Sequence, residues 1–177
     1  MGCDIHAYVE YSKNGKHWRN LTDNAGSRNY VMFGVLAGVR VADAKLFDPK
    51  GMPEGELSFT TAGDYWLNVA PESNPDWADG DGWTSLENAR RWVESGYSVP
   101  DYRDETLKRV SGPDWHSHSW LTTDELAAAI EHYRTVVGNY WPEEGGRAPT
   151  EWVAILAAMR AIESNGETAR VVFWFDN

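Results

Sequence analysis

The chain has 177 residues, of which 27 are acidic and 16 are basic, and its formal net charge is −11. Hydrophobic residues make up 42% of it and ten residues are Trp, which excludes an intrinsically disordered acidic tail. The negative charge excludes a protein that coats long nucleic acid, because such binding needs a basic face. A chain of this length fits one domain, residues 1–177, that buries its core without a disulfide or a metal.

The cellular compartment is indicated by the single cysteine and by the lack of targeting signals in the sequence. The lone cysteine, Cys3, cannot form an intramolecular disulfide, which favours a reducing cytoplasm. No apolar run reaches the roughly 18 residues that a transmembrane helix needs, and the N-terminus lacks the pattern of a signal peptide. His6 stands where a myristoylation signal requires Ser or Thr. We therefore expect a cytoplasmic protein without a membrane partner.

The negative charge is spread unevenly along the chain. Residues 1–42 have a net charge of +2, residues 43–105 a net charge of −9, and residues 106–177 a net charge of −4. The middle segment is therefore expected to be a solvated, loop-rich excursion. The overall charge does not exclude a small anionic ligand that binds to the slightly positive N-terminal segment.

The first predicted element is a strand at residues 3–11, where apolar and polar side chains alternate with period two. The odd-numbered residues form its apolar face, so we expect this strand to be half buried. The dipeptide Asn14-Gly15 follows and is typical of a hairpin turn, because both residues tolerate positive φ. The return strand is expected at residues 17–21.

Residues 28–39 are predicted to form a helix, because apolar residues recur at helical spacing and Gly38 is suited to end it. Residues 43–83 contain many Pro and Gly residues and show no sustained period. We expect them to form an acidic irregular insertion with one short strand at residues 57–61. Long loops of this kind in a compact domain are usually functional or mobile.

Three further helices are predicted to start at Thr84, Thr122 and Thr150, and the first two of these residues have capping-box spacing to a Glu. The residues expected to end these helices are Gly96, Gly138 and the pair Asn165-Gly166. A final strand at residues 169–176 is apolar on both faces, so it is expected to be central, beside the first strand. The predicted class is α+β: a small, mostly antiparallel sheet covered by three to four helices.

The first candidate for chemistry is the pair Asp4 and His6 in the first strand. Residues two apart on a strand point to the same face, so a carboxylate and an imidazole would lie side by side. They could serve as metal ligands or as an acid–base pair. The alternative is the polar edge of a half-exposed strand.

The second candidate is His116-Ser117-His118, which lies just before a predicted helix and is flanked by Trp115 and Trp120. In an extended segment the two His side chains share a face and can chelate a metal or act as base and acid. The two Trp rings could form stacking walls for a nucleobase. The alternatives are solvent-exposed histidines and tryptophans that hold loops on the core.

The third candidate is the set Arg28, Asn29, Tyr30 and Arg40, which brackets the first predicted helix. A guanidinium beside the free N–H groups of a helix N-terminus is a suitable phosphate site. The alternative is that these are ordinary surface residues.

Four patches of the sequence carry a resemblance: Met1–His6, Arg28–Tyr30, Leu36–Arg40 and His116–Thr122. Together they resemble a group of small, mostly uncharacterised proteins of tailed phages and prophages. The resemblance implies a phage origin and the host cytoplasm, and it brings no established activity. By analogy with small phage proteins that counter host immune signals, it favours a phosphorylated nucleotide as the ligand.

Three functions remain open. In the first, a phosphodiesterase-type hydrolase cleaves a cyclic dinucleotide or an ADP-ribose derivative that signals anti-phage immunity, with His6, His116 and His118 as acid and base. A divalent metal, if one is bound, would be held by Asp4 and the same three histidines. In the second, a homo-oligomer sequesters this nucleotide without cleaving it. In the third, the acidic insertion inhibits a host defence protein by covering its basic surface.

Overall fold

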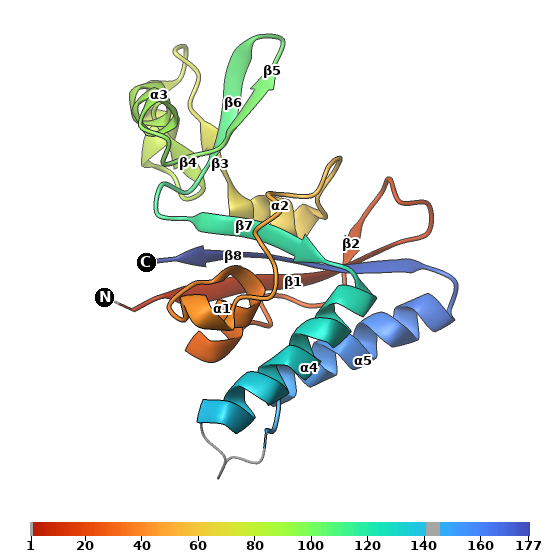
Figure 1. The fold of residues 1–177 in the computed structure, drawn as a ribbon. Helices are drawn as coiled ribbons and strands as arrows, with labels where there is room; N and C mark the ends of the chain where they lie inside the picture. The colour runs from red at the N-terminus through yellow and green to blue at the C-terminus, as the bar shows by residue number, and fades with distance from the viewer. Residues whose placement is uncertain (1, 141–145) are drawn as a thin grey trace. The chain divides into compact units, whose positions relative to one another are not determined.

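A computed structural model describes residues 2–140 and 146–177 of the chain. The chain divides into two compact units: unit 1 comprises Met1–Ser58 and Ser117–Asn177, and unit 2 comprises Phe59–His116 (Figure 1). Unit 2 begins within the expected insertion at residues 43–83 and continues past it. Helices and two four-stranded sheets occur in the described residues, which confirms the predicted α+β class.

The sheet of unit 1 has the strand order β2-β1-β8-β7. Its strands are β1 (Asp4–Ser12), β2 (Arg19–Asn20), β7 (His116–Leu121) and β8 (Thr168–Asp176). Strands β1 and β8 pair antiparallel along their whole length, from Asp4 opposite Asp176 to Ser12 opposite Thr168. The prediction that the C-terminal strand is central and lies beside the first strand is therefore confirmed.

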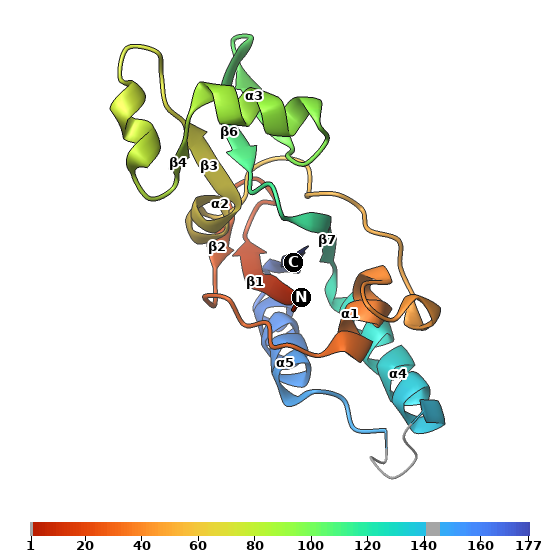
Figure 2. The same cartoon turned by 90° about the vertical axis from the view of Figure 1, so that its left-hand side faces the viewer.

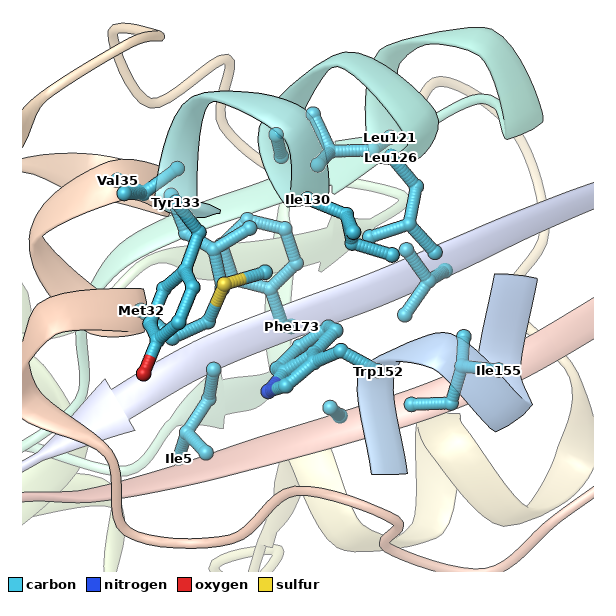
Figure 3. Close-up of a cluster of buried hydrophobic side chains, with 14 of the residues drawn as sticks. Ile5, Met32, Val35, Leu121, Leu126, Ile130, Tyr133, Trp152, Ile155 and Phe173 are labelled. Carbon is cyan, nitrogen blue, oxygen red and sulfur yellow. The ribbon is translucent and has the colours of Figure 1, made fainter. Parts of the chain in front are cut away.

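One face of this sheet is covered by helices α1 (Tyr30–Ala37), α4 (Thr123–Tyr140) and α5 (Thr150–Ser164); the short 3₁₀ helix η1 (Ala42–Ala44) follows α1. The odd-numbered residues of β1 and β8 point into the core that these helices close. Figure 3 shows Trp152 of α5 and Phe173 of β8 at the centre of this core, with Ile130 of α4 close by. Each large apolar side chain that is fully buried in this way contributes about 1.5–3 kcal/mol.

The opposite face of β1 differs from the expectation of a half-buried strand. Tyr8 and Glu10 are buried as completely as Val9 between them. Glu10 lies opposite Arg170 of β8, and the two side chains form an ion pair. The period-two pattern predicts which residues share a face, but a buried ion pair lets the polar face be covered as well.

Unit 2 has its own small sheet with the strand order β4-β3-β6-β5. Its elements are α2 (Phe59–Tyr65), β3 (Trp66–Val69), η2 (Pro75–Asp79), β4 (Trp83–Thr84), α3 (Leu86–Glu94), β5 (Pro100–Arg103) and β6 (Thr106–Ser111). A separate cluster of buried residues forms its core, and α3 lies beside β6 (Figure 2). Val69, Ala89, Leu107 and Val110 are the buried members of this core.

The predicted end of the first helix at Gly38 and the predicted capping box of α4 are both confirmed. Gly38 ends α1 in the left-handed region, with φ of 71°, where an L side chain would be strained. At the start of α4, Glu125 Oε2 accepts from the Thr122 backbone N–H at 2.9 Å, and Thr122 Oγ1 accepts from the Glu125 N–H at 3.3 Å. This is the reciprocal capping box that the sequence predicts.

Other boundaries are corrected by the structure. The prediction of a short strand at residues 57–61 is wrong, because the helix α2 begins at Phe59. Helix α3 is capped by Ser85, whose Oγ accepts from the Asn88 N–H at 3.1 Å, whereas Thr84 belongs to the strand β4. Gly138 does not end helix α4, because the helix continues to Tyr140. Among the described helices, none is long and apolar enough to cross a membrane.

Candidate functional site

The antiparallel pairing of β1 with β8 places the start of one strand beside the end of the other (Figures 1 and 2). Several of the sequence candidates meet there, together with residues from β8. We call this cluster the Asp4 corner. Its members are Gly2, Asp4, His6, Arg28, Arg40, Trp174 and Asp176.

Asp4 and Arg28 form a two-pronged ion pair at the corner. Arg28 Nε donates to Asp4 Oδ1 and Arg28 Nη2 donates to Asp4 Oδ2, both at 2.7 Å. The hydrogen bonds from Arg28 hold the pKa of the Asp4 carboxyl below its ordinary value, and Asp4 raises the pKa of Arg28. The side chains are 55% and 52% exposed, so water competes for both partners.

Arg40 reaches the same corner from the segment after α1. Its Nη2 atom donates to the Gly2 carbonyl oxygen and to Asn177 Oδ1, each at 3.1 Å. Gly2 also lies against Arg28, because a Cβ atom at this residue would be 3.1 Å from Arg28 Nη2. Two guanidinium groups therefore converge on residue 2, where the missing side chain leaves them room.

His6 is held in a defined orientation beside these charges. Its Nε2 atom lies 2.8 Å from Asp176 Oδ2, and its ring stacks on the Trp174 ring at a centroid distance of 5.2 Å. Asp176 Oδ1 accepts a hydrogen bond from the Asp4 backbone N–H at 3.1 Å. Because a carboxylate only accepts hydrogen bonds, Asp176 selects the ring form with hydrogen on Nε2. A His oriented by a carboxylate is suited to acid–base work.

Cys3 is adjacent to the corner and belongs to the core. It is buried, and burial raises the pKa of its thiol, although a hydrogen bond with Arg40 opposes this shift. A thiol in this environment stays protonated at neutral pH and is a weak nucleophile. The chemistry available at the corner therefore comes from the guanidinium groups, the carboxylates and the imidazole.

Asn29 and Tyr30, which the sequence suggests as ligand-binding residues, have clear local roles. Asn29 caps α1, because its Oδ1 atom accepts from the Met32 N–H at 2.9 Å. Its Nδ2 atom donates to the Tyr133 hydroxyl at 3.1 Å and so ties α1 to α4. The half-exposed Tyr30 ring lies 5.9 Å from Arg40 Cζ, where it borders the corner.

The segment of His116 and His118 forms the strand β7, where the sequence indicates a loop before a helix. Ser117 between them has φ of 51°, which interrupts the regular alternation of side chains. The His118 carbonyl oxygen accepts from the Gly51 N–H at 2.9 Å, so part of the preceding loop covers this strand edge. β8 lies between β1 and β7 in the sheet, so His118 is not on the strand next to His6.

The two tryptophans suggested as stacking walls are already in contact with neighbouring side chains. Lys50 Nζ lies 3.7 Å from the centre of the Trp120 ring and also binds Glu125 at 2.8 Å. In unit 2, the Trp115 ring stacks on Tyr65 at a centroid distance of 5.7 Å. These contacts stabilise the fold, and neither Trp is a member of the Asp4 corner.

The conditional metal site of Asp4, His6, His116 and His118 is not assembled. Within residues 2–140 and 146–177, no group of three or more His, Cys, Asp or Glu side chains is arranged to hold a metal ion. The physical reason at the corner is that Asp4 binds Arg28 and His6 binds Asp176.

Sequence reasoning missed Asp176, Trp174 and Gly2. The first two are on β8, and their partners on β1 follow only from the register of the two strands, which local patterns do not contain. Gly2 carries a weak signal, since a glycine beside charged residues permits close approach of a bulky group. A scan against protein-family models and searches of curated proteins and solved structures find no match for this chain.

Proposed function

We propose that the Asp4 corner binds a small molecule with a phosphate or diphosphate group. The observation that carries this proposal is the convergence of the Arg28 and Arg40 guanidinium groups on Gly2, beside the His6–Asp176 pair. Guanidinium groups bind phosphate oxygens through two parallel hydrogen bonds, which Lys cannot reproduce. Two of them at one exposed corner give a site for a doubly charged group.

Binding requires Asp4 to leave Arg28. The Asp4 carboxylate occupies the same two N–H groups that a phosphate would take. Exposed ion pairs contribute little to stability, so the exchange of one anion for another costs little. A diphosphate carries two negative charges against one on the carboxylate, and a singly charged phosphodiester gains over the carboxylate by taking Arg40 as a second partner.

Within this class, the resemblance to small phage proteins favours a nucleotide signal of host defence, such as a cyclic dinucleotide or an ADP-ribose derivative. The side chains at the corner bind the phosphate and leave the identity of the base open. Sequestration requires only the two guanidinium groups, so binding without cleavage is the simplest function.

Cleavage of a phosphodiester is a second candidate, and the His6–Asp176 pair favours it. The hydrogen bond at 2.8 Å and the stacking on Trp174 restrict the ring to one orientation. An oriented imidazole can move a proton to or from a phosphodiester oxygen while Arg28 and Arg40 neutralise the phosphate. His116 and His118 would then have roles other than ligating a metal with Asp4.

The experiment separates binding from cleavage. The protein is incubated with cyclic di-AMP, cyclic di-GMP and ADP-ribose, separated from free ligand, and then heated. Intact ligand released on heating supports sequestration, and a new product that forms before heating supports hydrolysis. If none of the three binds at micromolar protein concentration, the proposal is wrong. Addition of a chelator during the incubation tests whether any cleavage needs a metal.

A matched pair of variants assigns the result to the corner. Arg28→Gln removes one guanidinium from the site, whereas Arg19→Gln removes an exposed guanidinium from β2, beside the other end of β1. Both variants change the net charge equally. We expect retention of the ligand to be lost only in Arg28→Gln.

A further inference from the structure

Unit 2 contains a groove that is separate from the Asp4 corner. It has a volume of about 530 Å³, which lies within the range of small-molecule sites. Its walls come from the end of β3, from α3 and from the hairpin formed by β5 and β6. Val69 and Leu107 of the small core form its floor together with Leu86. We call it the hairpin groove.

The hairpin that forms one wall departs from regular strand pairing at one place. A shift in the β5–β6 register occurs between Asp101 and Tyr102, and Tyr102 lines the groove with 55% of its surface exposed. Asp104 and Glu105 have φ of 48° and 61°, as the two central residues of a two-residue type I′ hairpin turn require. Glu105 also lines the groove. Register irregularities like the one at Tyr102 are frequent next to functional sites, where they re-aim a side chain.

The charged residues of the groove do not neutralise one another. Arg90 and Lys108 are its cations, and Glu72 and Glu105 are its carboxylates. In the part of the chain that the structure describes, none of these four is in an ion pair within 4.0 Å. The same hairpin does pair charges outside the groove, where Arg109 binds Asp101 at 2.7 Å. The groove therefore presents both signs of charge to a ligand above an apolar floor.

We infer that the hairpin groove binds a small zwitterion with an apolar or aromatic body, the chemistry of a free amino acid or a dipeptide. Its carboxylate binds Arg90 or Lys108, and its ammonium group binds Glu72 or Glu105. Its apolar body packs on the floor and against the Tyr102 ring. A simple anion would pair with the two cations only and a simple cation with the two carboxylates only, whereas a molecule with both charges pairs with both.

Three probes test this inference on the full chain by isothermal titration or by saturation-transfer NMR. L-phenylalanine has both charged groups, phenylpropanoate lacks the ammonium group, and phenylethylamine lacks the carboxylate. We expect L-phenylalanine to bind, and each analogue to bind about tenfold more weakly or less well, because loss of a charged partner leaves a groove charge unpaired. No binding of L-phenylalanine at millimolar concentration, or equal binding of all three probes, would overturn the inference.

Variants place the probe in the groove. Arg90→Gln and Glu105→Gln are each expected to weaken L-phenylalanine binding about tenfold. Arg103→Gln is the matched control, because Arg103 is exposed on the same hairpin and does not line the groove. Equal losses in all three variants would contradict the assignment. Arg28→Gln should leave this binding unchanged, so failure of the corner and failure of the groove are distinguishable.

Discussion

Two acid–arginine pairs involve the same strand and differ in burial. At one end of β1, Asp4 pairs with Arg28, and both side chains are about half exposed. Toward the other end, Glu10 pairs with Arg170 of β8, and the side chains are 0% and 6% exposed. The acid lies on the same face of the strand in both cases, since residues 4 and 10 are separated by an even number.

Both side chains of the buried pair bind several groups of the surrounding fold. Glu10 Oε2 accepts from Arg170 Nε at 2.7 Å, and Glu10 Oε1 accepts from the Ser58 N–H at 2.8 Å. Arg170 also donates to the Glu56 carbonyl oxygen, and its guanidinium lies 3.6 Å from the Trp18 ring. Burial lowers the pKa of Arg170, and the charge of Glu10 opposes that shift. No ligand can replace either partner without opening the sheet face.

The exposed Asp4–Arg28 pair has the same two chemical groups, but solvent reaches both of them. Water and dissolved anions already compete with Asp4 for Arg28, so a phosphate can replace the carboxylate. Burial therefore decides whether an acid–arginine pair stabilises the fold or is available for exchange. Replacement of each acid by its amide gives a matched series of tests.

The largest effect is expected for Glu10→Gln. This change removes the charge that compensates the buried Arg170, and such losses destabilise by about 3–5 kcal/mol. Urea unfolding of the variant and the wild type measures the difference in the free energy of unfolding.

A control for this prediction replaces both partners, as Glu10→Leu with Arg170→Met. Because no buried charge is then left alone, we expect the double variant to be more stable than Glu10→Gln. If Glu10→Gln lowers the free energy of unfolding by less than about 1 kcal/mol, the buried pair does not stabilise the fold as proposed.

An intermediate effect is expected for Glu125→Gln. Glu125 binds Lys50, and both side chains are about one-third exposed. Burial opposes ionisation of Glu125, but hydrogen bonds from Lys50 and the Thr122 backbone outweigh it and lower the pKa below the ordinary 4.5. We expect this variant to lose about 1 kcal/mol at neutral pH.

The pH dependence of that loss has a defined sign. A carboxyl whose pKa is lower in the folded state stabilises the fold above its ordinary pKa and loses this contribution as the pH falls through the folded value. The gap between wild type and Glu125→Gln should therefore be constant above pH 4.5 and narrow below it. Urea unfolding at a series of pH values checks this, and a gap that widens in acid would contradict the assignment.

The smallest effect on stability is expected for Asp4→Asn. The carboxylate is exposed and its removal leaves Arg28 in water, so the melting temperature should not change measurably. Ligand affinity should rise several-fold, because the competing anion is gone from the guanidinium group. Calorimetric melting and ligand titration of the same sample measure both. A large fall in melting temperature would make this pair a structural one like Glu10–Arg170.

Local patterns predict much of this molecule and fail where distant segments meet. Period two identifies β1 and places Asp4 and His6 on one face, and the Thr122–Glu125 spacing identifies the start of α4. The helix α2 lies where a strand was expected, because its seven residues are too few to show a helical period.

The candidate site shows the same limit. The positive N-terminal segment points to Arg28 and Arg40, and these residues do reach the start of β1. Asp176 and Trp174 could not be added, because their positions depend on a pairing of segments about 170 residues apart. The local roles of Asn29 and Trp120 likewise follow from partners on other elements.

The most direct test titrates the ligand that the incubation experiment retains into wild type, Asp4→Asn, Arg28→Gln and Arg19→Gln. We expect tighter binding by Asp4→Asn, loss of binding in Arg28→Gln, and no change in Arg19→Gln. Affinity should fall as salt is raised, because exposed charges are screened. Undiminished binding by Arg28→Gln, with all four proteins equally folded, would contradict the assignment of the phosphate to the Asp4 corner.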